Sequence, residues 1–475
     1  MQLDDCFAMF GVDELLIQRI MGTALGRGGD YCDLYFQNRV SHWIGLEDHV
    51  VNATHAGVDF GVGIRVLQGD QTGYSFTEEI TPAAMDQAAR TAAAIASSGR
   101  AVEPGRLTPR STPQYYPIQT PLEDVAPDRK VPFLPLIDQK AFALDRRLTK
   151  CRVAWRDEYS YVLIASSDGR IVWDYQPMTG LYASCSAEEH GQKETGFYAI
   201  SGRHGIEHYT PELVDRVAKE AVARTVVNFE AVKPEAGEME VVLAPGSSGI
   251  LLHEAIGHGL EADFNRKKIS TFADKLGQSV AERFVTIVDD GTLPNLRGSI
   301  NIDDEGNDSQ RTVVVEDGLL ASFLHDRISG RHYGAAPTGN GRRESFRHAP
   351  MPRMRNTYML PGPHDPQDIV HSVQKGIYTE EFSNGEVSIG AGDFTFYVKT
   401  GYLIEQGKLT RPIKEVNIIG NGPEVLRRIT MVGNDLRFSE SWWNCGKWGQ
   451  GMPVQMGLPT VKVSAITVGG VNTAS

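Results

Sequence analysis

Apolar and polar residues alternate along much of the first 200 residues, and glycines interrupt the alternation. The stretch from Tyr31 to Phe76 contains YCDLYFQ and FGVGIRVLQGDQTGYSF. A period of two indicates strands that bury one face, and glycine at the breaks favours tight turns. Further along, YVLIASSDGRIVWDY predicts a hairpin that turns at Asp168-Gly169, and the strand-like segments LYASCSAEEH and TGFYAISGRHG follow it.

Helix signals are fewer and stand apart from the strands. Residues 13–21 (DELLIQRIM) have the spacing of a short amphipathic helix. Thr81 and Thr210 each precede a proline, which is typical of an N-cap followed by the first helical residue. We therefore predict helices over TPAAMDQAARTAAAIASS and PELVDRVAKEAVARTVVNF.

The second half of the chain is rich in strands and turns. The strand-like EMEVVLAP precedes a helix that begins at Ser247 or Ser248, and Asp317-Gly318 and Gln406-Gly407 mark further hairpin turns. Segregated helices and mainly antiparallel sheet indicate the α+β class. We expect mixed α/β regions at the N-terminus and a large strand-rich C-terminal domain that carries the helix described below.

Breaks in the pattern divide the chain into regions. Residues 100–135 hold eight prolines and few periodic apolar residues, and KPEAGE at 233–238 is a second break. We expect an N-terminal α+β domain, a proline-rich linker, a central α+β domain and a C-terminal domain. Their expected ranges are 1–99, 100–137, 138–232 and 238–475.

Charge and cysteine content narrow the classes of function. Lys plus Arg is 47 and Asp plus Glu is 60, a net charge of −13. Proteins that hold nucleic acid present basic surfaces, so we expect no direct nucleic-acid partner. The sequence has no run of 18 apolar residues and no secretory signal pattern, and its five cysteines form no C-x-x-C pair. We therefore expect a cytoplasmic protein without a membrane partner.

The segment His253-Glu254-Ala255-Ile256-Gly257-His258 carries candidate chemistry. Two imidazoles can hold a zinc ion, and an adjacent carboxylate can accept a proton from the attacking water. The histidines are five apart, which on an ideal α-helix separates them by about 140°. We predict a π-type widening or a helix end between Ile256 and His258, eased by Gly257. Two unrelated histidines on a buried helix are the alternative.

A catalytic zinc site needs a third protein ligand. Cys445, in the glycine-containing segment WWNCGKWGQG, is the best candidate. Glu261 and Asp263 are the alternatives, and either can instead accept a hydrogen bond from a ligating imidazole. The other four cysteines are read as small buried apolar residues.

Two further groups are weaker candidates. Arg342 and Arg343, in TGNGRRES, can offer donors to a peptide carboxylate or an oxyanion, or can belong to a structural loop. The tryptophans Trp442, Trp443 and Trp448 surround Cys445 and either shape a side-chain pocket or pack in a core.

Several long blocks of the chain resemble the TldD family of zinc metallopeptidases. They are HEAIGHGLEADFNR, DDGTLPNLRGSINIDDEG, PTGNGRRESFRHAPMPRMRNTYMLPG, MVGNDL and CGKWGQ. The resemblance implies that His253, His258 and Cys445 bind Zn²⁺ and that Glu254 is the base. It also implies a cytosolic dimer, formed with a PmbA-type paralogue that lacks the zinc motif or with a second copy. Cleavage of unfolded peptides, maturation of peptide antibiotics and degradation of antitoxins are activities associated with the family.

We expect a zinc-dependent peptidase that hydrolyses unfolded or disordered peptides. The alternative is a non-catalytic, peptide-binding subunit of a TldD/PmbA-type complex, against which the intact His, Glu, His and Cys set argues. A third hypothesis is a DNA-associated regulator of gyrase, which the acidic balance of the chain disfavours.

Overall fold

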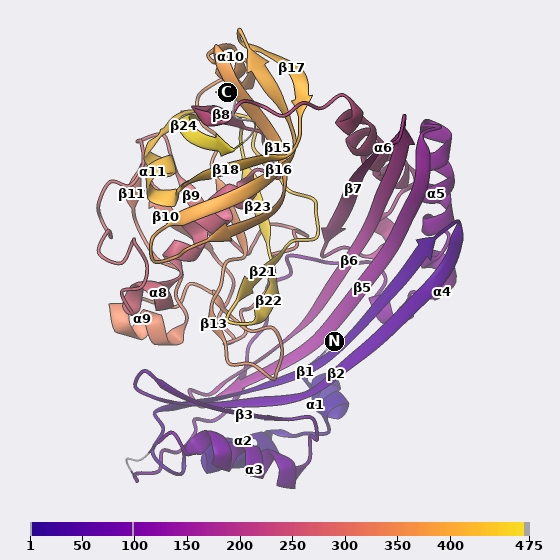
Figure 1. Ribbon diagram of the computed structural model, residues 1–475. Coiled ribbons are helices and arrows are strands. Elements are labelled where there is room, and N and C mark those ends of the chain that lie inside the picture. Colours follow the sequence, from indigo (N-terminus) through magenta and orange to yellow (C-terminus); the bar gives the residue numbers. More distant parts are fainter. Residues whose placement is uncertain (1, 97–98, 470–475) are drawn as a thin grey trace.

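Four strands of 17 to 20 residues form one long, curved sheet in the computed structural model, which describes residues 2–96 and 99–469 (Figure 1). The strand order is β3–β2–β1–β5–β6–β4, with β7 beside β6. The strands are β1 (Tyr31–Glu47), β2 (Val50–Gln68), β3 (Gln71–Thr77), β4 (Thr108–Pro109), β5 (Leu148–Ser166), β6 (Arg170–Glu189) and β7 (Gln192–Gly202).

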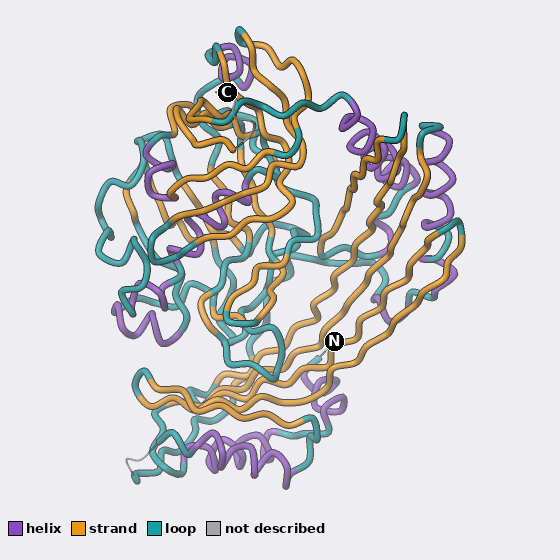
Figure 2. The backbone as a smooth tube through the Cα atoms, viewed as in Figure 1, coloured by secondary structure: helices purple, strands orange, loops and turns teal. Residues whose placement is uncertain are grey.

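Two groups of helices cover the convex face of this sheet, one at each end (Figures 1 and 2). Each group of helices packs on its own apolar cluster. Strands of about 18 residues are long enough to carry one cluster at each end. The first group is α1 (Leu3–Phe10), α2 (Glu14–Leu25) and α3 (Pro82–Ala93). The second is α4 (Pro127–Lys130), α5 (Phe133–Leu144) and α6 (Pro211–Val226).

The first and central regions of the sequence contribute to the same sheet. Strand β1 pairs with β5 from Asp33↔Ser166 to Leu46↔Val153. Helix α4 lies within the segment expected to be a linker, and α5 begins at Phe133, before the expected end of that segment. The expected domain boundaries stay a prediction. The pairing of β1 with β5 shows that the first and the central region are joined by backbone hydrogen bonds.

Most of the local expectations are confirmed. The turns at Asp168-Gly169, Asp317-Gly318 and Gln406-Gly407 each join two paired antiparallel strands. The hydroxyls of Thr81 and Thr210 accept hydrogen bonds from the N–H groups of Ala84 and Leu213 and so cap α3 and α6. The α+β class, with a strand-rich C-terminal region, is also confirmed.

The C-terminal region contains a closed five-stranded barrel and a second sheet. In the barrel, β8 pairs with β15 and β24, β24 pairs with β18, and β16 closes the ring between β18 and β15. Strands β17 and β19 pair with β16 and β24 outside the ring. The strands are β8 (Gly237–Leu243), β15 (Lys375–Val387), β16 (Asp393–Glu405), β17 (Lys408–Ile413), β18 (Val416–Asn421), β19 (Ile429–Val432) and β24 (Val461–Gly469).

The second sheet has the order β11–β10–β9–β14–β23–β20, and a separate hairpin, β21–β22, projects beside it. Both sheets share one large apolar core. The strands are β9 (Ile287–Asp290), β10 (Arg311–Glu316), β11 (Leu319–Leu320), β14 (Asn356–Met359), β20 (Arg437–Phe438), β21 (Asn444–Lys447), β22 (Gln450–Pro453) and β23 (Gln455–Leu458). The short pair is β12 (Gly341–Arg342) and β13 (Met351–Pro352), and the remaining helices are α7 (Gly249–Leu252), α8 (Ala262–Arg266), α9 (Arg327–Tyr333), α10 (Pro366–His371) and α11 (Gly422–Arg427).

The C-terminal domain lies on the concave side of the long sheet (Figure 1). Buried ion pairs join the two bodies: Arg65 of β2 contacts Glu305 at 2.7 Å, and Arg343 contacts Asp33 of β1 at 3.2 Å. All four side chains are buried, so these pairs fix the position of one body against the other. In the described part of the chain, no helix combines the length and apolar character needed to cross a membrane.

Candidate metal centre

The segment after β8 carries the two histidines. Ser248 precedes α7 as predicted, but its hydroxyl donates to the carbonyl of Thr379 at 2.8 Å and makes no side-chain cap. Helix α7 ends at Leu252, and the chain continues as a π-helical turn over His253–Gly257 and a 3₁₀ turn over His258–Leu260.

The π-helical turn confirms the prediction made from the five-residue spacing. The N–H of His258 donates to the carbonyl of His253, five residues back, which is the π pattern. The wider turn brings both rings to one side of the helix, with their centroids 5.2 Å apart. Both side chains are buried.

Gly257 has a different role from the expected one. Its backbone is ordinary right-handed helix, with φ −58° and ψ −50°, so no special conformational freedom is used. A Cβ at this position would lie 2.1 Å from Sδ of Met354. Glycine at this position therefore allows Met354 to pack directly against the π-helical turn.

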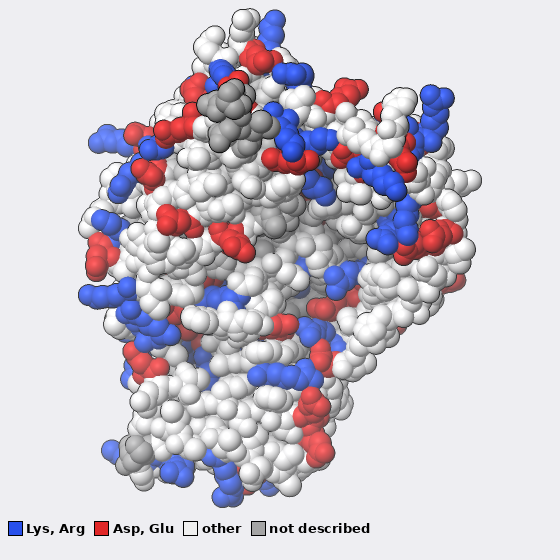
Figure 3. All heavy atoms as spheres, viewed as in Figure 1, with Lys and Arg blue, Asp and Glu red and all other residues white. Residues whose placement is uncertain are grey.

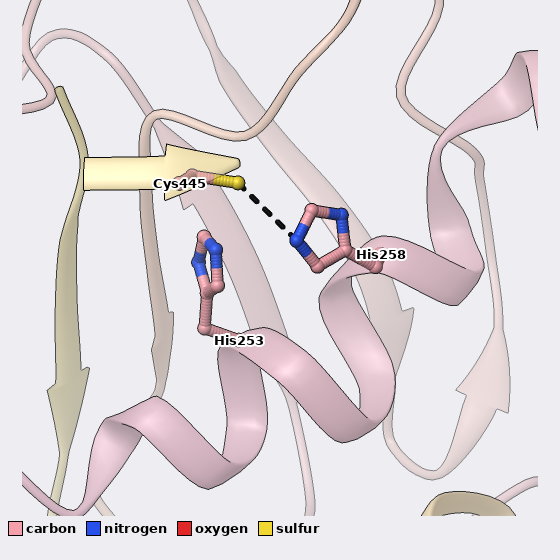
Figure 4. A group of neighbouring side chains, drawn as sticks. All are labelled: His253, His258 and Cys445. Carbon is pink, nitrogen blue, oxygen red and sulfur yellow. Dashed lines mark hydrogen bonds between the residues drawn. The ribbon is translucent and has the colours of Figure 1, made fainter. Parts of the chain in front are cut away.

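Cys445 completes a three-residue group with the two histidines (Figure 4). It lies on β21, and its Sγ is 3.2 Å from Nε2 of His258. One possible ligand atom from each residue lies within 4.8 Å of the others. Among the described residues, these three are the group of His, Cys, Asp or Glu side chains whose ligand atoms lie close enough together to hold one metal ion.

The structure separates the alternatives Glu261 and Asp263 from the ligand set. Glu261 accepts from Nδ1 of His258 at 2.9 Å, which leaves Nε2 directed at Cys445. Asp263 lies 2.7 Å from Nζ of Lys447. Glu261 thus fixes the ring of His258, in the position that carboxylates take beside metal-binding histidines.

Charges around the three residues support a thiolate. Burial opposes ionisation of Cys445, but the imidazoles of His258 and His253 outweigh it and lower the pKa of the thiol well below its ordinary value. Burial also opposes protonation of His258, but Cys445 and Glu261 raise the pKa of this imidazole well above its ordinary value. The lowered pKa of Cys445 and the raised pKa of His258 therefore favour opposite charges on these two groups.

Glu254 lies next to the group without belonging to it. Its Oε2 is 3.6 Å from Nε2 of His258, and its side chain is 20% exposed. It faces a cavity of about 730 Å³ that is also lined by Ile250, Trp443, Trp448 and Val454. Burial raises the pKa of Glu254 above its ordinary value.

Arg342 and Arg343 do not reach this cavity. Both are buried in a neighbouring cavity. Arg342 donates to the carbonyl of Met354 at 2.6 Å, and the guanidinium of Arg343 donates to Asp33 and to the carbonyl of Asp304. Trp443 and Trp448 line the metal cavity, whereas Trp442 lines the neighbouring one.

Two basic residues that the sequence analysis did not consider position the site. Lys447 contacts Glu261 at 3.1 Å, and Lys447 with His258 holds the pKa of Glu261 at about 2 despite its burial. Arg353 donates to the carbonyl of Cys445 and lies 3.9 Å from Glu261. Lys447 stands two residues after Cys445 in sequence and could have been suspected, but nothing near Arg353 in the sequence connects it to the site.

A π-helical histidine pair, a buried thiol and an adjacent carboxylate define a metal-dependent hydrolase. Comparison with known families agrees. Residues 32–96, 120–229 and 236–470 match domain 1, the central domain and the C-terminal domain of the PmbA/TldA metallopeptidases. The chain belongs to this TldD/PmbA family of metallopeptidases.

Individual relatives support the same conclusion. The chain is 42% identical over 455 residues to a metalloprotease TldD homolog of Haemophilus influenzae, with 94% of each chain covered. It is 33% identical over 258 residues to a zinc metalloprotease TldD homolog of Saccharolobus solfataricus, covering 54% of this chain and 57% of that one. The crystal structure of TldE from Thermococcus kodakarensis has the same fold, with a TM-score of 0.76, 18% identity and coverage of 96% and 99%.

Proposed function

We propose that this metalloprotease uses Zn²⁺ at His253, His258 and Cys445 to hydrolyse unfolded or disordered peptides. The observation that carries the proposal is the convergence of three buried ligand atoms within 4.8 Å beside Glu254. Two imidazoles and one thiolate form a set of zinc ligands that leaves a fourth position open.

The residues present fit that ion. Both ring nitrogens of His253 are buried and have no hydrogen-bond partner among the described residues. Leaving them so is costly, and a metal ion is the ligand that a neutral imidazole nitrogen beside a thiolate suits. When bound, Zn²⁺ would polarise the scissile carbonyl and acidify a water molecule.

Glu254 then supplies the proton transfers. Its carboxylate accepts a proton from the attacking water and delivers it to the leaving amine. The raised pKa of Glu254 favours the first of these transfers, acceptance of the proton. Glu261 holds His258 by Nδ1 throughout, and Arg353 holds the backbone of Cys445.

Extended, unstructured substrates suit the surroundings of the site. The β21–β22 hairpin carries Cys445 and is a two-stranded sheet of its own in the described part of the chain. An extended peptide can bind such an edge through backbone hydrogen bonds with little sequence preference. Trp443 and Trp448 offer aromatic surface to its side chains.

We further propose a cytoplasmic dimer, formed with a PmbA-type paralogue or with a second copy, and no direct contact with nucleic acid. The net charge of −13 supports the last point, and on the face shown in Figure 3 basic and acidic side chains are interspersed. The test is to digest one small domain in its folded form and as a destabilised mutant, with the paralogue present and absent. Equal rates for both forms would contradict the preference for unfolded substrates, and full activity of an isolated monomer would contradict the dimer.

The catalytic assignment has its own experiment. Glu254→Gln should lower peptide cleavage by about 10²–10⁴-fold, because a general base contributes that much, while bound zinc stays near the wild-type level. Cleavage is measured with an unstructured peptide and zinc by elemental analysis. A variant that keeps most of its activity would show that Glu254 is not the base, and a wild-type chain with zinc but no cleavage would favour the alternative of a peptide-binding subunit.

A further inference from the structure

A second polar cavity lies beside the β21–β22 hairpin, next to the metal cavity. Its volume is about 240 Å³, and six arginines and three carboxylates line it. Asn444, one residue before Cys445, lines both this cavity and the metal cavity. The arginines are Arg39, Arg156, Arg203, Arg297, Arg342 and Arg343.

For four of these arginines, no carboxylate oxygen of a described residue lies within 4.0 Å of a guanidinium nitrogen, the distance limit of an ion pair. Three of the four, Arg203, Arg297 and Arg342, are at least 95% buried. Their guanidinium groups donate to neutral acceptors, which are the carbonyls of Pro177, Trp443 and Met354 and the side-chain oxygen of Asn444. The fourth is Arg156, which is exposed.

Several buried donors at this cavity have no acceptor in the described part of the chain. They include Nη1 of Arg297, Nε of Arg203 and Nε1 of Trp442. Arg156 and Arg297 both stack on the ring of Trp442, with Cζ 4.7 and 4.1 Å from its centroid. Buried donors without acceptors are costly, and a ligand made of acceptors would remove that cost.

The cavity is lined by six guanidinium groups and only three carboxylates, so positive charge is in excess. Asp304 accepts from the backbone N–H of Arg343, and Glu344 accepts from that of Gly451. Burial lowers the pKa of Arg297 to about 9, and Glu158 offsets only part of this shift. Burial likewise lowers the pKa of Arg342 to about 10.

We propose that this arginine-lined cavity binds an oxyanion, and that during peptide cleavage the oxyanion is the C-terminal carboxylate of the substrate. The guanidinium fork matches carboxylate and phosphate oxygens in geometry and charge. The assignment to a peptide terminus rests on the proposed peptidase function, whereas the anion site itself does not.

The neighbouring surface favours a peptide terminus over a free phosphate. An apolar cavity of about 380 Å³ shares Arg156 and Trp442 with the arginine-lined cavity. Its lining includes Leu46, Val153 and Ile200. An apolar C-terminal residue can therefore place its carboxylate among the arginines and its side chain in the apolar cavity.

The test is calorimetric binding to the Glu254→Gln protein, with and without zinc, of an unstructured peptide that ends in leucine. The peptide is used as the free acid and as the C-terminal amide. We expect the free acid to bind about tenfold more tightly, which corresponds to the strength of a charged hydrogen bond. Arg156→Gln should remove that difference, and Arg90→Gln, an exposed arginine on α3 that pairs with Asp86, should preserve it.

Further arms distinguish the sources of the anion. Acetate and inorganic phosphate are titrated separately into the same proteins, and Arg297→Gln, checked for folding by circular dichroism, is a second variant. Equal affinities of acid and amide, with arginine-dependent binding of acetate or phosphate, would support the oxyanion site and assign it to a free anion. If no anion binds, or if both variants leave binding unchanged, the proposal is wrong. Because binding is measured without turnover, its failure is distinguishable from failure of the peptidase assignment.

Discussion

The two cavities beside the β21–β22 hairpin differ in the kind of buried polar atom that lacks a partner. On the metal side they include the ring nitrogens of His253, one of which has a free lone pair in the neutral imidazole, next to the thiol of Cys445, and also Nε1 of Trp443. On the arginine side they are donors, on Arg203, Arg297 and Trp442. A free imidazole lone pair beside a thiol suits a cation, and buried guanidinium donors without acceptors suit an anion.

The two cavities also differ in how their charges are arranged. At the metal site, buried charged neighbours pair with one another: Glu261 lies between His258 and Lys447, and Asp263 also contacts Lys447. The arginine cavity has an excess of guanidinium groups over the carboxylates that line it. The metal site is therefore organised to orient ligands, whereas the arginine cavity supplies positive charge.

The largest expected effect concerns the thiol of Cys445 and tests whether the metal cavity binds a cation as proposed. Cys445→Ala should lower zinc affinity by more than about 100-fold, beyond the usual cost of losing an outer partner, because two imidazoles hold the ion poorly. Zinc is measured by competition with a chelator, with Cys32→Ala as a control for a buried cysteine outside the site. Nearly stoichiometric zinc in Cys445→Ala would show that another residue is the third ligand.

A smaller effect sharpens the role of the carboxylates. Glu261→Gln should weaken zinc binding by roughly 10–100-fold, because it removes the charge that Nδ1 of His258 faces. Asp263→Asn should cost less, since Asp263 contacts Lys447 and not the imidazole. The chelator competition compares the two variants directly. A larger loss in Asp263→Asn than in Glu261→Gln would reverse the assignment of Glu261 as the positioning residue.

The smallest effect tests the anion side through Trp442. A Cβ on Gly180 of β6 would lie 2.3 Å from the Trp442 ring, so Gly180→Ala should displace the ring on which Arg156 and Arg297 stack. We expect a few-fold weaker binding of the free-acid peptide, measured by calorimetry, and unchanged zinc affinity. Gly22→Ala on α2, where a Cβ would meet nothing, is the control. Unchanged peptide affinity in folded Gly180→Ala protein would remove Trp442 from the anion site.

The sequence alone located those helices and turns that begin or end at a characteristic local motif. Threonine before proline located the starts of α3 and α6, and glycine after a turn residue located three hairpins. The five-residue spacing of His253 and His258 predicted a π-type widening or a helix end if both rings face one ion, and the π-helical turn is the first of these. These inferences depend on neighbours within about one turn of the chain.

The sequence by itself therefore determined the α+β class, the starts of α3 and α6, three hairpin turns and a break from regular α-helix between His253 and His258, but not α4 and α5, which begin within the expected linker. The tertiary structure alone decided that the first and central regions share one sheet, that Met354 packs against Gly257, and that Arg353 donates to the carbonyl of Cys445. It also placed Arg342 and Arg343 away from the metal and beside Arg203 and Arg297. These facts depend on contacts between residues up to about 140 positions apart, such as Arg203 and Arg342 in one cavity, and local periodicity carries no information about such contacts.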